Sequence, residues 1–207
     1  VIADTLAEKH RQVRAVHHER PLGRAEAIKT GLSCSTKDVV VYAGAELPFD
    51  LDELERALHL LDALEADVIC GYRLDRASRG VFGLVSSVAY DVLVRGLFRV
   101  PLKDVNFAFK VVHRRVLESI ELKAGGDFVE AELLVKAMRR GFRVFQIGVD
   151  HFPRESVAPR PSAFEALQLV RELSALYSET TSPGEPVRPV RLPPTVRALR
   201  RRAAAAQ

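Results

Sequence analysis

The sequence predicts an α/β fold in which a mainly parallel sheet is flanked by helices. Short apolar segments of strand length alternate along the chain with longer segments whose apolar residues recur at helical spacing. Residues 37–43, KDVVVYA, are apolar at consecutive positions, which is typical of a parallel strand covered on both faces. The alternation of strand and helix is itself the pattern of an α/β sheet.

The first part of the chain is expected to supply two strands and three helices. We expect a helix near residues 2–7, a strand at 13–16, a helix at 23–34, a strand at 37–43 and a helix at 51–66. The helix at 51–66 has the clearest start, because Asp50 or Asp52 can accept hydrogen bonds from its first free amides. Its apolar residues then recur on one face, as in a helix that packs on a sheet.

The second part continues the alternation. We expect strands at 67–72, 106–113 and 142–151, and helices at 80–98, 114–120, 128–141 and 162–177. The segment 80–98 is long and apolar with small residues, which fits a buried or membrane-facing helix. Gly141 is the usual residue for the left-handed cap that ends a helix.

Composition separates a folded body from a tail. The chain has 207 residues, of which 47% are hydrophobic and 28% charged, as expected for one globular domain with a core. From Glu179 onward Pro, Ser and Arg dominate and no apolar period remains. We therefore predict a domain at 1–178 and a Pro/Arg-rich, disordered tail at 179–207.

The positive charge of the chain is concentrated in that tail. The formal net charge is +4, and residues 188–207 contain six arginines and no acid. The body is therefore close to neutral, so the sequence does not favour nucleic acid as a partner.

Other sequence features concern the compartment and the start of the chain. Cys34 and Cys70 are isolated, so neither a zinc site nor a disulfide framework is indicated, and a reduced cytoplasmic setting fits. No run reaches the roughly 18 apolar residues that a membrane span needs. The sequence begins without Met in a helical pattern, as if a segment upstream of Val1 were missing.

The turn after the strand at 37–43 is the first candidate site. It carries Glu46 and Asp50, with Gly44 before them. Side chains two residues apart at a strand end face the same side, so an acid at 44 and one at 46 could hold a divalent cation together. Only Glu46 is present, and from spacing alone a polar turn leading to a helix is the simpler interpretation.

Basic residues near a helix start and in a later strand are the next candidates. Gly23 precedes a helix that begins with Arg24, and a helix N-terminus with basic side chains attracts phosphate, although a plain loop-to-helix junction is the simpler interpretation. Asp104 precedes an apolar strand that contains Lys110. A buried charge needs a partner, so these two form either a structural pair or parts of a site.

Charged residues also flank the last predicted strand. Glu130 is an acid at a helix start, and Glu132, two residues later, could act as a general base if burial raised its pKa. His151, Arg154 and Arg160 follow the strand, and guanidinium groups there suit diphosphate recognition. Taken singly, these residues are more simply interpreted as surface charges.

The order of these motifs resembles the family 2 glycosyltransferases, and within them the polyprenyl- or dolichol-phosphate mannosyl- and glucosyltransferases. The resemblance covers residues 1 to about 175. It is carried by GRAEAIKTG (23–31), YAGAELPFDLDEL (42–54), GYR (71–73), DVNFAFK (104–110), VEAELL (129–134) and GVDHFPR (148–154). The Asp-x-Asp motif of the family is degenerate here, since Gly44 replaces its first acid and Pro48 replaces a Gln that follows.

The resemblance implies a GT-A fold, a Rossmann-like sheet, that lacks the first nucleotide-binding strands of the family. It implies a reaction in which a GDP- or UDP-linked sugar is transferred to a polyprenyl phosphate, with Mg²⁺ or Mn²⁺ at the acidic turn. Glu46 would then be the remaining metal ligand. The implied site residues are Glu46, Asp104 and Glu132 for catalysis and Arg24, Arg73, Lys110 and Arg154 for substrate and phosphate.

Two further expectations follow from the resemblance. The helix at 162–177 would lie along a membrane surface with the basic tail nearby, which places the protein in the cytoplasm, at the cytoplasmic face of a membrane. The alternative to an active transferase is an impaired or inactive relative that serves as a binding or scaffold module. This alternative is based on Gly44, on Pro48 and on the missing first strands.

Overall fold

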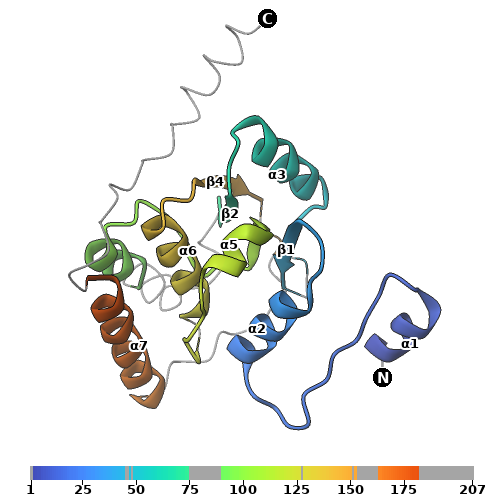
Figure 1. The fold of residues 1–207 in the computed structure, drawn as a ribbon, viewed down its shortest axis with the longest axis horizontal. Coiled ribbons are helices and arrows are strands. Elements are labelled where there is room, and N and C mark those ends of the chain that lie inside the picture. Colours follow the sequence, from blue (N-terminus) through green and yellow to red (C-terminus); the bar gives the residue numbers. More distant parts are fainter. Residues whose placement is uncertain are drawn as a thin grey trace, which may run out of the picture.

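The architecture is described from a computed structural model (Figure 1). It describes residues 2–44, 47, 49–74, 90–126, 128–150, 152 and 163–181. The named elements are α1 (Ile2–Lys9), α2 (Arg24–Cys34), β1 (Val39–Ala43), α3 (Asp52–Ala63), β2 (Val68–Arg73), β3 (Phe109–His113), α5 (Arg114–Ser119), α6 (Val129–Arg139), β4 (Val144–Val149) and α7 (Ala163–Thr181). Residues 90–98 are also helical.

The described strands form one sheet in the order β1-β3-β2-β4. β2 and β4 are parallel, whereas β3 is antiparallel to both of its neighbours. β1, β2 and β4 therefore point in one direction and β3 opposes them. The α/β class is confirmed; the reversed strand was not predicted, because strand length and apolar pattern do not encode strand direction.

Helices cover both faces of the sheet. On one face α3 contributes Ala57 and Leu61 to a core with Phe109 and Val111 of β3. On the other face α6 and the helix at 90–98 form the larger core, which includes Val94, Phe98 and Leu134. Alternation along β3 explains the division, because Phe109 and Val111 point to one face while Lys110 and Val112 point to the other.

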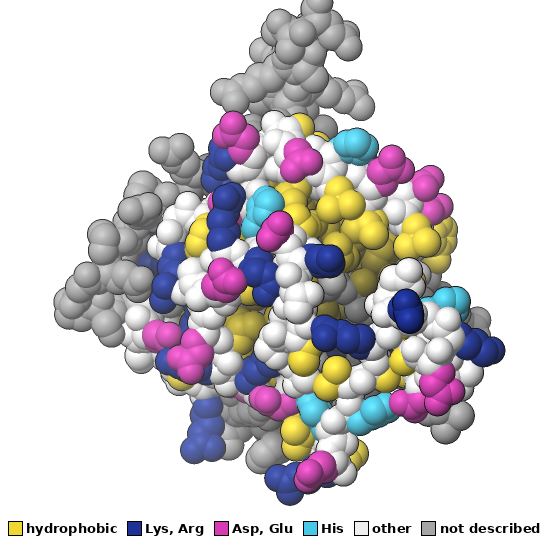
Figure 2. All heavy atoms as spheres, turned by 45° about the vertical axis from the view of Figure 1, so that its right-hand side comes forward, with side chains coloured by type: hydrophobic (Ala, Val, Ile, Leu, Met, Phe, Trp, Pro, Cys, Tyr) yellow, Lys and Arg dark blue, Asp and Glu magenta, His cyan; other side chains and the backbone are white. Residues whose placement is uncertain are grey.

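The α3 face is only partly covered near β1. Val41 of β1 is 41% exposed, Leu51 61% and Leu58 of α3 37%. Figure 2 looks at the side of the molecule that carries α1, β1 and α3, and apolar side chains gather on that side.

The last helix, α7, packs on the body instead of presenting its whole apolar face outward. Leu173 and Leu176 are almost fully buried in the larger core, and Phe98 lies against Tyr177 with ring centroids 6.4 Å apart. Two leucines of α7 are therefore used in the core, whereas Val170 and Tyr177 are exposed, and the expected contact of this helix with a membrane stays a prediction. No described helix is long and apolar enough to cross a bilayer.

Three expected boundaries differ from the structure. Residues 13–16 are not a strand, and Val13 and Val16 are exposed in an extended segment that leads away to α1 (Figure 1). The strand expected at 106–113 starts at Phe109, because the Phe107 N–H donates to the Asp104 carbonyl in a turn. α7 continues to Thr181, three residues past the predicted domain end at 178.

Candidate functional site

The candidate turn follows β1 and lies against the loop before β3. The Gly44 N–H donates to the Ala108 carbonyl at 3.2 Å, and the Leu47 N–H donates to the Gly44 carbonyl at 3.0 Å. Glu46 and Pro48 lie outside the described residues. The two segments that were expected to share a site, 42–54 and 104–110, are therefore in contact through their backbones.

The motif GYR also contacts that loop. Gly71 leaves room for two aromatic rings: a Cβ at this position would lie 2.8 Å from Phe109 Cδ1 and 3.1 Å from Phe107 Cδ1. Such distances exclude any side chain at 71 without movement of these rings. The Arg73 guanidinium then lies over the Phe107 ring, 5.5 Å from its centroid.

Arg73 and Asp104 form a buried, bidentate ion pair. Arg73 Nε donates to Asp104 Oδ2 at 2.7 Å and Nη2 to Oδ1 at 2.5 Å, while the Arg73 backbone N–H also donates to Oδ2. Both side chains are at most 3% exposed. The Asp104 backbone N–H in turn donates to the Asp91 carboxylate at 2.9 Å. This arrangement fixes the loop on β2, and the Arg73 guanidinium is not presented to solvent, where a phosphate would reach it.

A second polar cluster, on the other face of the sheet, joins α2, β1, β3 and α6. It consists of Arg24, Tyr42, Lys110 and Glu130, and we call it the Glu130 cluster. Glu130 Oε1 accepts hydrogen bonds from Arg24 Nη2 and from the Tyr42 hydroxyl, each at 2.5 Å. Lys110 Nζ lies 3.6 Å from Glu130 Oε2 and donates to the Phe107 carbonyl at 2.8 Å.

Burial divides the members of the Glu130 cluster. The Lys110 and Glu130 side chains are 1% exposed, whereas that of Arg24 is 44% exposed. Burial and the nearby Glu130 carboxylate raise the pKa of the Tyr42 phenol well above its usual value, so the hydroxyl stays a donor at neutral pH. Of the described residues expected to bind phosphate, Arg24 therefore has the exposure that such a contact needs, and Lys110 does not.

Asp104 and Lys110 thus have separate partners. Sequence reasoning missed Tyr42 and left Glu130 without a role. The signal for Glu130 was present, since it is the first acid of VEAELL, and Tyr42 is paired with Lys110 in the register of β1 and β3. The partner of Lys110 could not be read from the sequence because Glu130 comes from another element.

The carboxylate of Glu132, the expected general base, binds backbone N–H groups and a lysine of the protein itself. Its carboxylate accepts from the backbone N–H groups of Lys123 and Ala124 at 2.8 to 2.9 Å. Lys136, one turn later on α6, lies 2.8 Å from its Oε1. The carboxylate therefore holds the segment before α6 on that helix, and its assignment as a base stays a prediction.

The described residues do not by themselves form a metal site. Among them no group of three or more His, Cys, Asp and Glu side chains is arranged to hold an ion. Gly44 offers no carboxylate, and Glu46 and Arg154 lie outside the described residues. Space for an acid at 44 exists, because a Cβ there would have Ala108 Cβ as its nearest neighbour, at 3.8 Å.

Comparison with known proteins decides the family. The model of glycosyl transferase family 2 matches residues 1–119, which is more than half of the chain. The chain belongs to glycosyltransferase family 2. The motif order in the sequence predicted this family, and the contacts between motifs explain why they occur together.

Two relatives show how much of a family 2 protein the chain represents. Glycosyltransferase AglD of Haloferax volcanii is 34% identical over 158 residues, which cover 74% of this chain and 25% of AglD. An uncharacterized glycosyltransferase of Mycobacterium tuberculosis is 28% identical over 157 residues, covering 72% of this chain and 68% of that protein. The chain thus spans about a quarter of AglD.

Solved structures support the GT-A fold. Glucosyl-3-phosphoglycerate synthase from Mycobacterium tuberculosis, in complex with Mn²⁺, UDP-glucose and phosphoglyceric acid, matches with a TM-score of 0.55 at 18% identity. The match covers 79% of this chain and 56% of the synthase. The same synthase with Mg²⁺ and UDP matches with a TM-score of 0.51. At this identity the likeness concerns the fold.

Proposed function

We propose that this family 2 chain takes part in transferring a sugar from a nucleotide sugar to a polyprenyl phosphate. The observation that carries the proposal is the contact of the turn at Gly44 with the loop that holds Asp104, at the edge where β1 and β2 end. Ligands of α/β sheets bind in the crevice outside the carboxyl ends of the parallel strands. The nucleotide-sugar complexes of the synthase with the same fold add to this support.

The proposed acceptor explains why Glu132 is not needed as a base. A phosphate monoester is already ionised at neutral pH, so its oxygen can attack the anomeric carbon without losing a proton first. As that bond forms, the bond from the anomeric carbon to the diphosphate breaks, and its electron pair leaves with the nucleoside diphosphate. Charge builds on the departing diphosphate, and stabilising it is the main task of the site.

Arg24 is the described side chain best suited to that task. Its guanidinium is half exposed and held by Glu130 and Tyr42, which limits the side-chain entropy lost on binding phosphate. We propose Arg154 as a second phosphate contact and Glu46 as the carboxylate for Mg²⁺ or Mn²⁺. A divalent cation would supply further charge neutralisation at the diphosphate.

Calorimetric titration tests the nucleotide part of the proposal. We expect heat of binding for GDP or UDP in the presence of Mn²⁺, with a weak affinity because one acid of the Asp-x-Asp motif is absent. Nucleotide without Mn²⁺ is the control for metal dependence. Absence of heat at millimolar nucleotide, with and without Mn²⁺, would contradict the proposal.

An impaired relative is the second candidate, and the lost acid at Gly44 favours it. We expect the Gly44→Asp substitution to tighten Mn²⁺-dependent nucleotide binding by at least roughly tenfold, the lower range of what single groups at a metal site contribute. Gly31→Asp, in α2, is the matched control, because a Cβ at Gly31 meets no atom within 4 Å. Equal affinities for the wild type and both variants would mean that this turn holds no metal.

We also propose a cytoplasmic location at the face of a membrane, since a polyprenyl acceptor resides in the bilayer. Fractionation of cells into soluble and membrane pools, with a salt wash of the membranes, measures this directly.

A further inference from the structure

The helix at 90–98 has an unusual outer face. Asp91, Val94 and Phe98 are buried, as expected for the side that packs on the core. The opposite side is also largely apolar: Val92 is 60% exposed, Leu93 42% and Leu97 38%. A helix on the surface of a globular protein normally presents polar residues outward, so this side is suited to contact with something other than water.

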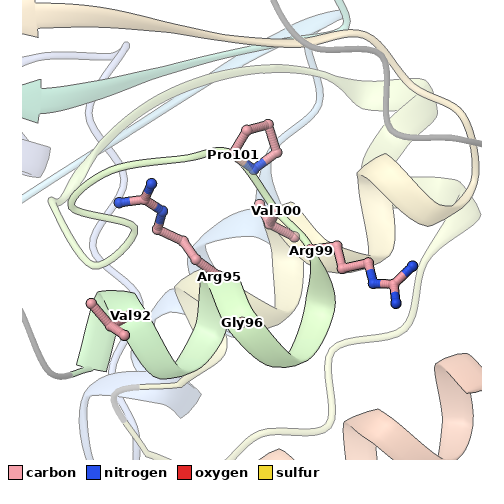
Figure 3. Close-up of a pocket in the computed structure, with 6 residues that line it drawn as sticks. All are labelled: Val92, Arg95, Gly96, Arg99, Val100 and Pro101. Atoms are coloured by element: carbon pink, nitrogen blue, oxygen red, sulfur yellow. The ribbon is translucent and has the colours of Figure 1, made fainter.

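A hollow flanked by two arginines lies at the end of the same helix. It has a volume of about 400 Å³ and is lined by Val92, Arg95, Gly96, Arg99, Val100 and Pro101. Figure 3 shows that the Arg95 and Arg99 side chains extend in opposite directions, away from each other. Gly96 lies between them on the helix, and a Cβ at Gly96 would meet no atom within 4 Å.

We propose that this face of the helix at 90–98, together with its two arginines, is a docking surface for an anionic lipid bilayer. The proposal deepens the proposed function, because it names the surface by which an enzyme acting on a polyprenyl phosphate rests on its membrane.

Charge supports a bilayer as the occupant. The sequence 92–103, VLVRGLFRVPLK, contains three basic residues and no acidic one. Helices that lie in the interface of anionic membranes combine apolar residues such as leucine with arginine or lysine, as this segment does. The apolar stems of the arginines can stay at the level of the acyl chains while their charged ends reach phosphate groups.

The directions of the two arginine side chains favour a bilayer over a single small anion as the ligand. One bound phosphate is best held by guanidinium groups that converge on it, because each then gives paired hydrogen bonds to the same group. Arg95 and Arg99 diverge instead (Figure 3), so they suit two separate headgroups.

Co-sedimentation with vesicles tests the proposal on the full chain. The vesicles are phosphatidylcholine with and without phosphatidylglycerol, and no nucleotide sugar is added. We expect binding to the anionic vesicles, weakened by about 30-fold in the Arg95→Gln/Arg99→Gln variant, since each arginine near such a surface contributes roughly fivefold. Val92→Gln/Leu93→Gln is expected to weaken it by a similar factor through lost apolar contact.

Matched controls are available on another side of the molecule. Leu51→Gln alters a residue that is more exposed than Leu93, and Arg11→Gln removes an exposed charge near α1. Both are expected to bind vesicles as the wild type does. All variants should keep the Tm of the wild type within a few degrees, because the altered side chains are exposed.

Several outcomes overturn the proposal. Undiminished binding by both double variants would assign the contact to another segment, and no binding to anionic vesicles would leave a protein as the partner of this face. Displacement by inorganic phosphate, but not by sodium chloride of equal ionic strength, would indicate a site for one small anion. Nucleotide titration of the same variants is expected to match the wild type, so failure of the docking surface and failure of the proposed function are distinguishable.

Discussion

We expect the Asp104→Ala substitution to lower the free energy of unfolding by about 3 to 5 kcal/mol, the cost of leaving one charge of a buried pair unpaired. Asp104 accepts three hydrogen bonds from Arg73, and both side chains are at most 3% exposed. Without the carboxylate, the Arg73 guanidinium would remain away from water beside the Phe107 ring. Urea denaturation followed by circular dichroism measures the change.

Backbone conformation adds to the effect and can be separated from it. Asp104 has a φ of +50°, a left-handed conformation that Asp and Asn adopt more readily than Ala. Asp104→Asn keeps that preference and one acceptor oxygen, so we expect a smaller loss than for Ala. The double variant Arg73→Met/Asp104→Leu removes both charges and should recover part of the stability.

An exposed ion pair is the control for this prediction. Arg143 pairs with Glu65 at 2.9 Å, but their side chains are 42% and 80% exposed. We expect Arg143→Ala to cost about 1 kcal/mol or less, because water screens such a pair. A loss for Asp104→Ala no larger than that of Arg143→Ala would show that the buried pair does not hold the loop on β2.

The sequence predicted the helices and strands well where periodicity decides them. Residues 37–43 and 67–72 are runs of apolar residues, and the strands β1 and β2 lie there. The segment 13–16, VRAV, also contains two valines but is exposed, because no described strand pairs with it. A short apolar run becomes a strand only when the sheet offers it a partner, and that is a property of the tertiary fold.

The charged residues were harder to interpret for a related reason. Arg24 and Glu130 are 106 positions apart in sequence, and Arg73 and Asp104 are 31 apart. A lone basic residue next to a strand looks like a phosphate ligand until its partner is known. The family could nevertheless be predicted from the order of its motifs along the sequence. The structure brings these motifs into contact: Gly71 accommodates Phe107 and Phe109, and the Gly44 N–H donates to the Ala108 carbonyl.

Lys110→Met is expected to have an effect of the same size on the opposite face of the sheet. Lys110 is fully buried, and its ammonium group is held by the Phe107 carbonyl, the Glu130 carboxylate and the Tyr42 ring. Methionine has nearly the same volume, so the packing changes little. The loss of the cation, however, leaves Glu130 Oε2 buried without the ammonium group beside it. The half-exposed Arg24 still pairs with the other carboxylate oxygen, so we expect a cost of about 3 kcal/mol, the low end for a broken buried pair.

A second substitution distinguishes an electrostatic cause of the Lys110→Met stability loss from a change in packing. Glu130→Gln in the Lys110→Met background removes the buried negative charge that Lys110 balanced while keeping an acceptor for Arg24 and Tyr42, so we expect it to restore part of the lost stability. In the wild-type background the same Glu130→Gln change should destabilise, because it leaves the buried Lys110 ammonium without its counter-charge. The effect of Glu130→Gln on stability is therefore expected to change sign with the residue at position 110. A double-mutant cycle measured by urea denaturation reports the coupling energy of Lys110 and Glu130. Additive losses would mean that Lys110 and Glu130 do not stabilise each other, and Lys110 would again be open to a role in binding substrate.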